Sequence, residues 1–334
     1  MKRLMRAAVL LLAATGLCAQ ARAADHVNVS VFGSVSDAGI YIAYDRGYFT
    51  AERLDVTLSQ LEATTMVMTT LVSGDIDVAG ASPSAGVYNA IRQGVPVHIV
   101  ADKGRMTVGH GYLSLVVRQE LRDRIKQVAD LKGRRLAWAA YDVGGTNAVA
   151  LDHLLRQGGL DVQDVMPVNL DFADSLAALG SGGVDAAYLA EPLVELAAAR
   201  GIGQVLMTGD RIYPDQQVAV LLYGPGFWQK RADAATRFMV AYLRGVRDYD
   251  DALAGRADRA AVVAILAAHT TVKDKAMYDR MILPAIDRNG EVNRAGMDSD
   301  LRWFQANGLV KGPLDAAAIF DDRFVKAAVQ RLAQ

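Results

Sequence analysis

Strand-like and helix-like patterns alternate along the first two-thirds of this chain, and this alternation limits its fold more than any other feature. Residues 27–31 alternate between apolar and polar, and residues 54–58, 76–79 and 97–101 repeat a strand pattern after intervening helical spacing. Such an order predicts a mostly parallel α/β sheet. Ligands of these sheets bind beyond the carboxyl ends of the strands.

The pattern Leu-x-Ser-Gly-x-[Ile/Val]-Asp-x-Ala occurs twice, at residues 71–79 and at residues 179–187. In both copies a glycine ends a helical pattern, an aspartate follows in a turn, and a buried strand comes next. The elements around the second copy, from residue 136 onward, also match the order around the first. We therefore expect two similar α/β lobes, although two common helix-to-strand turns could share this pattern by coincidence.

Two long apolar runs bracket the second lobe, at residues 113–117 and 218–223. We expect them to be crossover strands that link the lobes. Residues 109–111, Gly-His-Gly, precede the first of them and offer the permissive backbone that a hinge needs. Two-lobed proteins of this kind close around a ligand by hinge motion, and the pocket is expected between the lobes.

The start of the chain has the three parts of a secretory signal peptide. Three basic residues precede an apolar run over residues 7–17, and Ala-Arg-Ala at 21–23 forms a cleavage site. The run is too short to span a bilayer, which disfavours a membrane anchor. Cys18 leaves open a lipoprotein, although the leucine before it is bulkier than such sites prefer. We expect cleavage after Ala23 and export to the periplasm.

The predicted division of the chain therefore has four parts. They are the signal peptide (1–23), the first part of lobe 1 (24–115), lobe 2 (116–216), and a return strand with the helix-rich C-terminal part of lobe 1 (217–334).

Composition excludes several classes of function. Cleavage would remove four basic and no acidic residues from a chain with 36 Lys and Arg and 37 Asp and Glu, so the mature protein would be acidic. No basic stripe appears, and a nucleic acid is not an expected partner. The one cysteine leaves with the signal peptide, and the five histidines lack metal-ligand spacing. We expect no cofactor and no metal.

Residues 134–155 contain the strongest candidate for a binding site. A buried strand pattern at 136–140 leads through Gly144, Gly145, Thr146 and Asn147 into a helical pattern. A helix that starts here directs unpaired N–H groups and a partial positive charge toward one point, which favours an anion. The sequence matches neither the P-loop nor the dinucleotide pattern. The alternative is that these four residues are only a turn with a cap.

Polar side chains also gather where the strands of lobe 1 are expected to end. They are Ser36, Asp37, Thr64, Thr65, Ser82 and Ser84. Each alone is commonly a helix cap. Several at the same edge of a sheet favour a ligand site.

An ordered set of motifs resembles the substrate-binding proteins of ABC importers for nitrate, taurine, aliphatic sulfonates and thiamine-pyrimidine precursors. The motifs are Gly47-Tyr48-Phe49 with Glu52, Leu54-Asp55-Val56, Ser73-Gly74-Asp75-Ile76-Asp77, Asp130-Leu131-Lys132-Gly133, Gly159-Leu160 with Asp164-Val165, and Val184-Asp185-Ala186 with Glu191-Pro192. The resemblance spans residues 27–222. Arg53 departs from it, because relatives usually have glycine there.

The resemblance implies a type II periplasmic-binding-protein fold, with the helical C-terminal segment packed on lobe 1. It implies as partners an ABC-transporter permease and ATPase, with the membrane reached only through the permease, and a monomer. It also implies that certain residues face the cleft: Asp37, Tyr41, Thr65, the Ser82–Ser84 loop, the helix start at residues 144–147, and Glu191.

We expect the ligand to be a small organic anion or a zwitterion. Its acidic group would accept hydrogen bonds from the N–H groups of Gly145, Thr146 and Asn147 and from the hydroxyls of Ser82 or Ser84. Charge-assisted bonds of this kind each contribute about 1.5–3 kcal/mol. Four tyrosines are candidates to flank its body: Tyr41, Tyr88, Tyr141 and Tyr188. Aromatic carboxylates or sulfonates fit best, taurine-like amines next, and nitrate least.

Glu191 has two interpretations. In the cleft it would repel an anion and would need a donor such as an amine. Alternatively, it is a helix-start carboxylate stabilised by the helix dipole.

Two other functions stay open. Some proteins of this fold are enzymes, but no nucleophile–base pair or carboxylate dyad stands out in the sequence. A periplasmic sensor that signals to a membrane kinase has the same sequence features as a transport protein.

Overall fold

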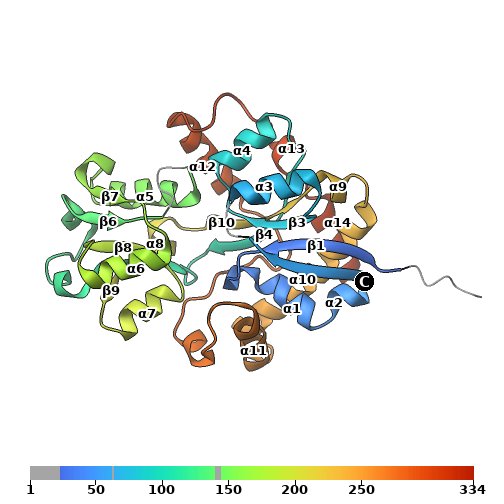
Figure 1. Cartoon of the computed structure of the whole chain (residues 1–334), viewed down its shortest axis with the longest axis horizontal. Coiled ribbons are helices and arrows are strands. Elements are labelled where there is room, and N and C mark those ends of the chain that lie inside the picture. The colour runs from blue at the N-terminus through green and yellow to red at the C-terminus, as the bar shows by residue number, and fades with distance from the viewer. Residues whose placement is uncertain (1–22, 62–63, 140–143) are drawn as a thin grey trace, which may run out of the picture.

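The computed structural model describes residues 23–61, 64–139 and 144–334, and the signal-peptide prediction therefore lies almost wholly outside the described residues. Figure 1 shows two α/β lobes side by side, each built on one five-stranded sheet. The lobe 1 sheet has the order β2-β1-β3-β10-β4, with bounds β1 Asp25–Val31, β2 Leu54–Gln60, β3 Val78–Ala81, β4 His98–Met106 and β10 Gln216–Tyr223. The lobe 2 sheet has the order β7-β6-β8-β5-β9, with bounds β5 Leu113–Arg118, β6 Arg135–Ala137, β7 Met166–Val168, β8 Ala186–Ala190 and β9 Gly203–Thr208.

In each sheet one strand runs against the others. β10 is antiparallel to both β3 and β4, and β5 is antiparallel to both β8 and β9. The remaining neighbours are parallel. The predicted mostly parallel α/β architecture and the paired lobes are therefore confirmed.

Helices cover both faces of the sheets. Lobe 1 carries α1 Ala38–Asp45, α2 Tyr48–Ala51, α3 Thr64–Ser73, α4 Ala85–Arg92, α9 Pro225–Trp228, α10 Ala232–Leu253, α11 Arg259–His269, α12 Arg294–Ala306, α13 Ala316–Ile319 and α14 Arg323–Leu332. Lobe 2 carries α5 Thr146–Gln157, α6 Phe172–Ser181, α7 Leu193–Ala199 and α8 Gly209–Ile212. Among the described residues, none of these helices is long and apolar enough to cross a membrane.

The long helix α10 packs closely on α1. Its apolar stripe, including Phe238, Tyr242 and Val246, is completely buried against the lobe 1 sheet and its helices. The closest approach is at two glycines, because a Cβ on Gly245 would lie 2.1 Å from the carbonyl oxygen of Gly39. This helix therefore belongs to the lobe 1 core, as the sequence predicts for the C-terminal segment.

The repeated motif has the same structure in both lobes. Asp77 precedes β3 and accepts a hydrogen bond from the backbone N–H of Asn28 in β1, at 3.0 Å. Asp185 precedes β8 and accepts the equivalent bond from Arg135 in β6, also at 3.0 Å. An arginine pairs with each carboxylate, Arg231 with Asp77 and Arg135 with Asp185. The repeat therefore reflects an equivalent turn in each lobe.

The chain crosses between the lobes at residues 107–112, before β5, and at residues 209–215, before β10. The two crossings touch, because a Cβ on Gly111 would lie 2.6 Å from the backbone nitrogen of Asp210. The Gly109 N–H donates to the Asp210 carboxylate at 2.9 Å. The predicted glycine-containing segment at residues 109–111 thus lies in the first crossing.

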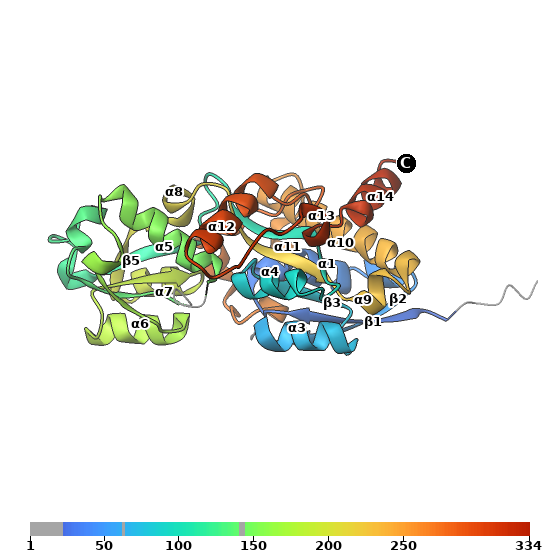
Figure 2. The same ribbon diagram turned by 90° about the horizontal axis from the view of Figure 1, so that it is seen from above.

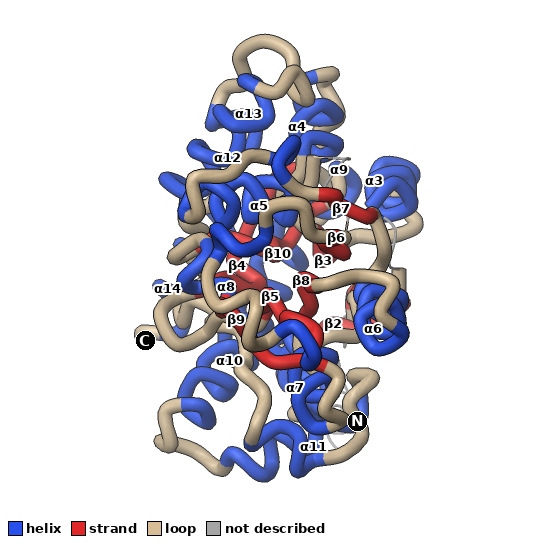
Figure 3. Tube along the Cα trace, turned by 90° about the vertical axis from the view of Figure 1, so that its left-hand side faces the viewer, coloured by secondary structure: helices blue, strands red, loops and turns tan. Residues whose placement is uncertain are grey.

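α12 lies at the junction of the lobes (Figure 2). It contacts α4 of lobe 1 and also α5 of lobe 2, and the three helices lie together in the view from the lobe 2 side (Figure 3). The C-terminal segment is therefore not confined to lobe 1.

Candidate functional site

The carboxyl ends of β1, β3 and β4 lie at the same edge of the lobe 1 sheet. The three strands run in the same direction, because β1 is parallel to β3 and both β3 and β4 are antiparallel to β10. The edge faces lobe 2. We call its polar residues the lobe 1 rim, and they are Ser34, Ser36, Asp37, Ser82 and Lys103.

Lys103 is the charged centre of the lobe 1 rim, and its side chain is completely buried. Its Nζ lies 2.7 Å from Oδ1 of Asp37 in an ion pair whose geometry is not that of a hydrogen bond. The same ammonium donates to the Ser36 hydroxyl at 2.8 Å and lies 4.5 Å from the centre of the Phe32 ring. The sequence analysis did not identify Lys103.

Asp37 organises the loop that follows β1. Its Oδ2 accepts hydrogen bonds from the backbone N–H groups of Phe32 at 2.9 Å and Ser34 at 3.1 Å. Tyr41 lies behind it, with its hydroxyl 3.5 Å from Asp37 and its ring stacked on His269. Burial raises the pKa of Tyr41, and the neighbouring Asp37 charge adds to this shift.

The start of α5 faces the lobe 1 rim from lobe 2. Gly144 has a φ of 73°, which suits glycine, and Gly145 is the N-cap of the twelve-residue helix. Within the described part of the chain, no acceptor pairs with the N–H groups of Gly145, Thr146 or Asn147. These donors and the helix dipole suit a negatively charged group.

The two sides of the site touch. The hydroxyls of Ser82 and Thr146 lie 3.1 Å apart, and Ser82 also donates to the carbonyl of Val218 at 3.0 Å. The N–H of Ala85, at the start of α4, donates to the Gly144 carbonyl at 2.8 Å. The start of α5 is therefore held against the carboxyl end of β3.

The other predicted lobe 1 residues have different positions. Ser84 is the N-cap of α4 and accepts a hydrogen bond from the Val87 N–H at 3.4 Å. The backbone of Thr65 lies in the first turn of α3, and its side chain lies outside the described residues. Tyr141 also lies outside them.

Two hydrogen bonds, made by the side chains of Trp138 and Asn147, join the first turn of α5 to the end of β6. The Trp138 indole donates to the Asn147 carbonyl at 2.7 Å, and the Asn147 amide donates to the Ala139 carbonyl at 3.1 Å. The Trp138 ring stacks on Tyr188 with centroids 4.1 Å apart. The Tyr188 hydroxyl is buried without a hydrogen-bond partner, and burial raises the pKa of this phenol.

Glu191 follows β8, and both of its carboxylate oxygens accept hydrogen bonds from backbone N–H groups. One oxygen accepts from Glu195 in α7 and the other from Ile282 in the C-terminal segment, each at 3.1 Å. Burial raises its pKa. Its position before a helix explains this arrangement without a ligand amine.

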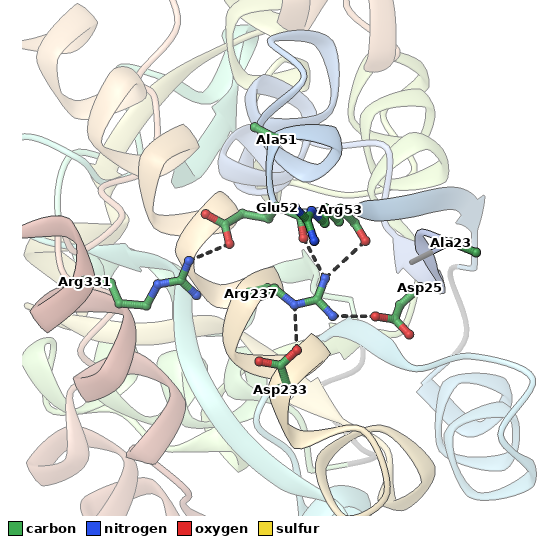
Figure 4. A pocket seen from close by; sticks show the side chains of 8 residues that line it. All are labelled: Ala23, Asp25, Ala51, Glu52, Arg53, Asp233, Arg237 and Arg331. Carbon is green, nitrogen blue, oxygen red and sulfur yellow. Dashed lines mark hydrogen bonds and ion pairs between the residues drawn. The ribbon is translucent and has the colours of Figure 1, made fainter. Parts of the chain in front are cut away.

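Two surface pockets lined by described residues lie on lobe 1, away from the lobe junction. The first, of about 300 Å³, is lined by Ala23, Asp25, Ala51, Glu52, Arg53, Asp233, Arg237 and Arg331 (Figure 4). Its charges pair with one another: Arg237 with Asp25 and Asp233, and Arg331 with Glu52. The second, of about 310 Å³, lies beside β4 near Gly290 and Phe320. The paired charges of the first pocket make it a structural ion network.

Arg53, in the first pocket, has a φ of 55°, in the left-handed region that favours glycine. An arginine therefore occupies a strained turn at a position where relatives usually have glycine.

Among the described residues, no group of three His, Cys, Asp or Glu side chains is placed to hold a metal ion. Lys103 is the one buried amine of the lobe 1 rim, and it is ion-paired with Asp37. The arrangement is suited to binding an anion through hydrogen-bond donors.

The sequence pattern of the family described as NMT1/THI5 like matches residues 35–252. The chain is 24% identical over 243 residues to the binding protein YtlA of Bacillus subtilis, covering 71% of this chain and 70% of that protein. It is 39% identical over 85 residues to an aliphatic sulfonates-binding protein of Escherichia coli, covering 25% of this chain and 26% of that protein.

Solved structures with the same fold include binding proteins and an enzyme. The periplasmic aliphatic sulphonate binding protein SsuA of Escherichia coli matches with a TM-score of 0.70 at 21% identity, covering 89% of this chain and 97% of that one. The periplasmic nitrate-binding protein NrtA of Synechocystis PCC 6803 matches with a TM-score of 0.72 at 15% identity, covering 92% and 89%. The desulfurization enzyme DSZB matches with a TM-score of 0.66 at 18% identity, covering 92% and 99%.

Proposed function

The chain belongs to the NMT1/THI5-like family and has the two-lobed fold of periplasmic binding proteins, and from this we propose that it is an exported protein that captures a small organic anion between its lobes. The resemblance inferred from the sequence motifs is confirmed at the level of family and fold.

The observation that carries this proposal is the position of the α5 start. Three N–H groups without acceptors among the described residues lie where Thr146 meets Ser82 across the lobe junction. On the lobe 1 rim, the buried Lys103–Asp37 ion pair holds the Ser36 hydroxyl, which accepts from Lys103. A carboxylate or sulfonate group offers the acceptors that such donors require.

The part of the ligand beyond its acidic group would contact apolar side chains. One hydrophobic cluster, which includes Trp138, continues through both lobes, and the partly buried Leu61 of lobe 1 and Phe172 of lobe 2 pack against it. An aromatic or aliphatic body suits these surroundings better than a bare inorganic ion. Relatives named for sulfonates and for nitrate support the anionic head group.

Binding without catalysis is proposed, although DSZB shows that this fold supports an enzyme. The one cysteine of the chain lies at position 18, in the proposed signal peptide, so the mature protein would have no thiol nucleophile. Delivery to an ABC permease and ATPase, a monomeric state and a periplasmic location complete the proposal.

A thermal-shift panel on the purified mature protein tests it. The panel contains aromatic and aliphatic sulfonates and carboxylates, taurine, nitrate and pyrimidines. A ligand at one hundred times its Kd stabilises the folded state by about 2.7 kcal/mol, so an anion should raise the melting temperature. A shift with neutral compounds alone would contradict the anion assignment.

A further inference from the structure

Asp300 is a buried carboxylate on α12 that faces the second crossing between the lobes. The residue is only 1% exposed to solvent. One carboxylate oxygen accepts a hydrogen bond from the Tyr213 hydroxyl at 2.7 Å. The Gln216 side chain lies close enough to lower the pKa of this carboxylate.

Gln216 connects Asp300 to the proposed anion site. Its amide nitrogen donates to the backbone carbonyl of Thr146 at 2.8 Å, and Gln216 is itself only 1% exposed. Thr146 supplies one of the N–H groups at the α5 start that have no acceptor among the described residues, and the hydroxyl that meets Ser82. Gln216, which lies beside Asp300, therefore joins the second crossing to the first turn of α5 in lobe 2.

A second set of contacts joins α12 to α5. The Trp303 indole donates to the Asp152 carboxylate at 3.0 Å. Tyr213, held by Asp300, stacks its ring on His153 with centroids 3.9 Å apart and planes 8° apart. Rotation of lobe 2 away from lobe 1 must break these contacts or displace α12.

We propose that Asp300 is a positioning residue for ligand binding: its ionised carboxylate orients Gln216 and Tyr213, which hold the first turn of α5 so that its N–H groups face the ligand. This inference rests on the proposed function. It assigns a role in affinity to a C-terminal residue that does not itself touch the ligand.

The charge state of Asp300 follows from its surroundings. Burial raises its pKa to about 7, while the hydrogen bond from Tyr213 and the nearby Gln216 side chain oppose this shift. An ionised carboxylate accepts the bond from Tyr213 and attracts the Gln216 amide, whereas a protonated one carries a donor of its own and loses acceptor capacity. Lowering the pH through 7 should therefore loosen the hold on α5.

Other titratable groups lie near Asp300 on each element packed against it: Tyr88 of α4, Tyr213 of the second crossing, Asp152 and His153 of α5, and Asp298 and Arg302 on α12 itself. Burial raises the pKa values of Tyr88 and Tyr213, so their phenols stay neutral. Burial lowers the pKa of the His153 imidazole.

The test compares wild type with Asp300→Asn. Calorimetric titration uses benzenesulfonate, because its charge is constant between pH 6.5 and 8.5. Wild type should bind about two- to fourfold more weakly at pH 6.5 than at pH 8.5, because a carboxylate with a pKa of about 7 is still about one-quarter ionised at pH 6.5. Asp300→Asn should bind weakly at both values. Asp298→Asn is the matched control on the exposed side of α12, and it should keep the wild-type profile.

Hydrogen exchange of the ligand-free proteins separates this inference from the proposed function. The hydrogen-bonded amides 148–151 at the start of α5 should exchange faster in Asp300→Asn than in wild type or Asp298→Asn. Unchanged exchange, or an Asp300→Asn affinity that follows wild type at both pH values, would overturn the positioning role. Faster exchange together with no binding of any panel anion by wild type would instead contradict the proposed function and with it the ligand-binding role of Asp300.

Discussion

The hydroxyl groups of Ser82 and Thr146 lie 3.1 Å apart across the junction of the two lobes. Ser82 follows β3 of lobe 1 and Thr146 begins α5 of lobe 2, so this contact joins the two elements that we propose to bind the ligand. The two residues are 64 positions apart in the sequence, and only the fold brings them together.

Replacing Ser82 with alanine should favour separation of the lobes. The change removes one hydrogen bond across the junction, worth about 1 kcal/mol, and leaves the fold of each lobe intact. Small-angle scattering of the ligand-free protein should give a larger radius of gyration. Ser84→Ala is the control, because it removes only the cap of α4. Identical radii for Ser82→Ala and wild type would show that this contact does not hold the lobes together.

Replacing Lys103 with methionine should strongly destabilise lobe 1. The variant leaves the Asp37 carboxylate buried without its ion-pair partner, and breaking a buried pair in this way costs about 3–5 kcal/mol. Urea denaturation measures the loss. Lys132→Met, which removes an exposed pair with Asp164 at 3.0 Å, should change the free energy of unfolding by less than about 1 kcal/mol. Equal effects of both variants would contradict a structural role for the buried pair.

The order of strands and helices could be read from the sequence because apolar periodicity follows burial directly. Residues 113–117 and 218–223 form β5 and β10, and the repeated motif marks the same turn in both lobes. β9 was missed, since Gly203–Thr208 is half-exposed at the sheet edge and lacks a clear apolar alternation.

Lys103 was missed for a different reason. The apolar pattern ends at residue 101, whereas β4 continues to Met106 with Asp102 and Lys103 completely buried. Charged residues in a buried strand are tolerated only with partners from distant segments, and Asp37 and Gln217 are not visible from local spacing. Charged residues directly after an apolar strand were the available signal.

Replacing Tyr188 with phenylalanine should stabilise the ligand-free protein and weaken ligand binding. The buried hydroxyl has no partner, and such a group costs about 1–3 kcal/mol. Its ring stacks on Trp138, whose indole donates to the Asn147 carbonyl, and we expect a bound anion to accept a hydrogen bond from the Tyr188 hydroxyl. Thermal melting and calorimetric titration measure the two effects. Tyr88→Phe removes another unpartnered buried hydroxyl, on α4, and should leave the affinity unchanged. Wild-type affinity in Tyr188→Phe would exclude this contact.

Asp102 should make stability depend on pH. Burial raises its pKa from 3.8 to about 6 in the folded protein, so the folded state binds this proton more tightly than the unfolded state. The stabilisation from the neutral carboxyl is fully present below pH 3.8 and is lost as the pH rises through 6. The free energy of unfolding of wild type relative to Asp102→Asn should therefore fall between pH 4 and 6, by at most about 1.4 kcal/mol per pH unit. Chemical denaturation across this range measures it, and a constant or rising difference would contradict the raised pKa.

The N–H groups at the start of α5 are the central element of this account, and Thr146 allows them to be tested separately from the side chain. Thr146→Pro removes one N–H at the first helical position, where proline is tolerated, and Gly145 already has the extended backbone that precedes proline. Thr146→Val keeps the N–H and removes only the hydroxyl.

The most direct measurement is the Kd of both variants for the anion that binds wild type most tightly, obtained by calorimetric titration at pH 8. Both variants lose the contact with Ser82, so the difference between them reports the N–H. The account predicts at least about tenfold weaker binding by Thr146→Pro than by Thr146→Val, as expected for a charge-assisted hydrogen bond. Equal affinity of the two variants would contradict the claim that main-chain donors of α5 hold the anion.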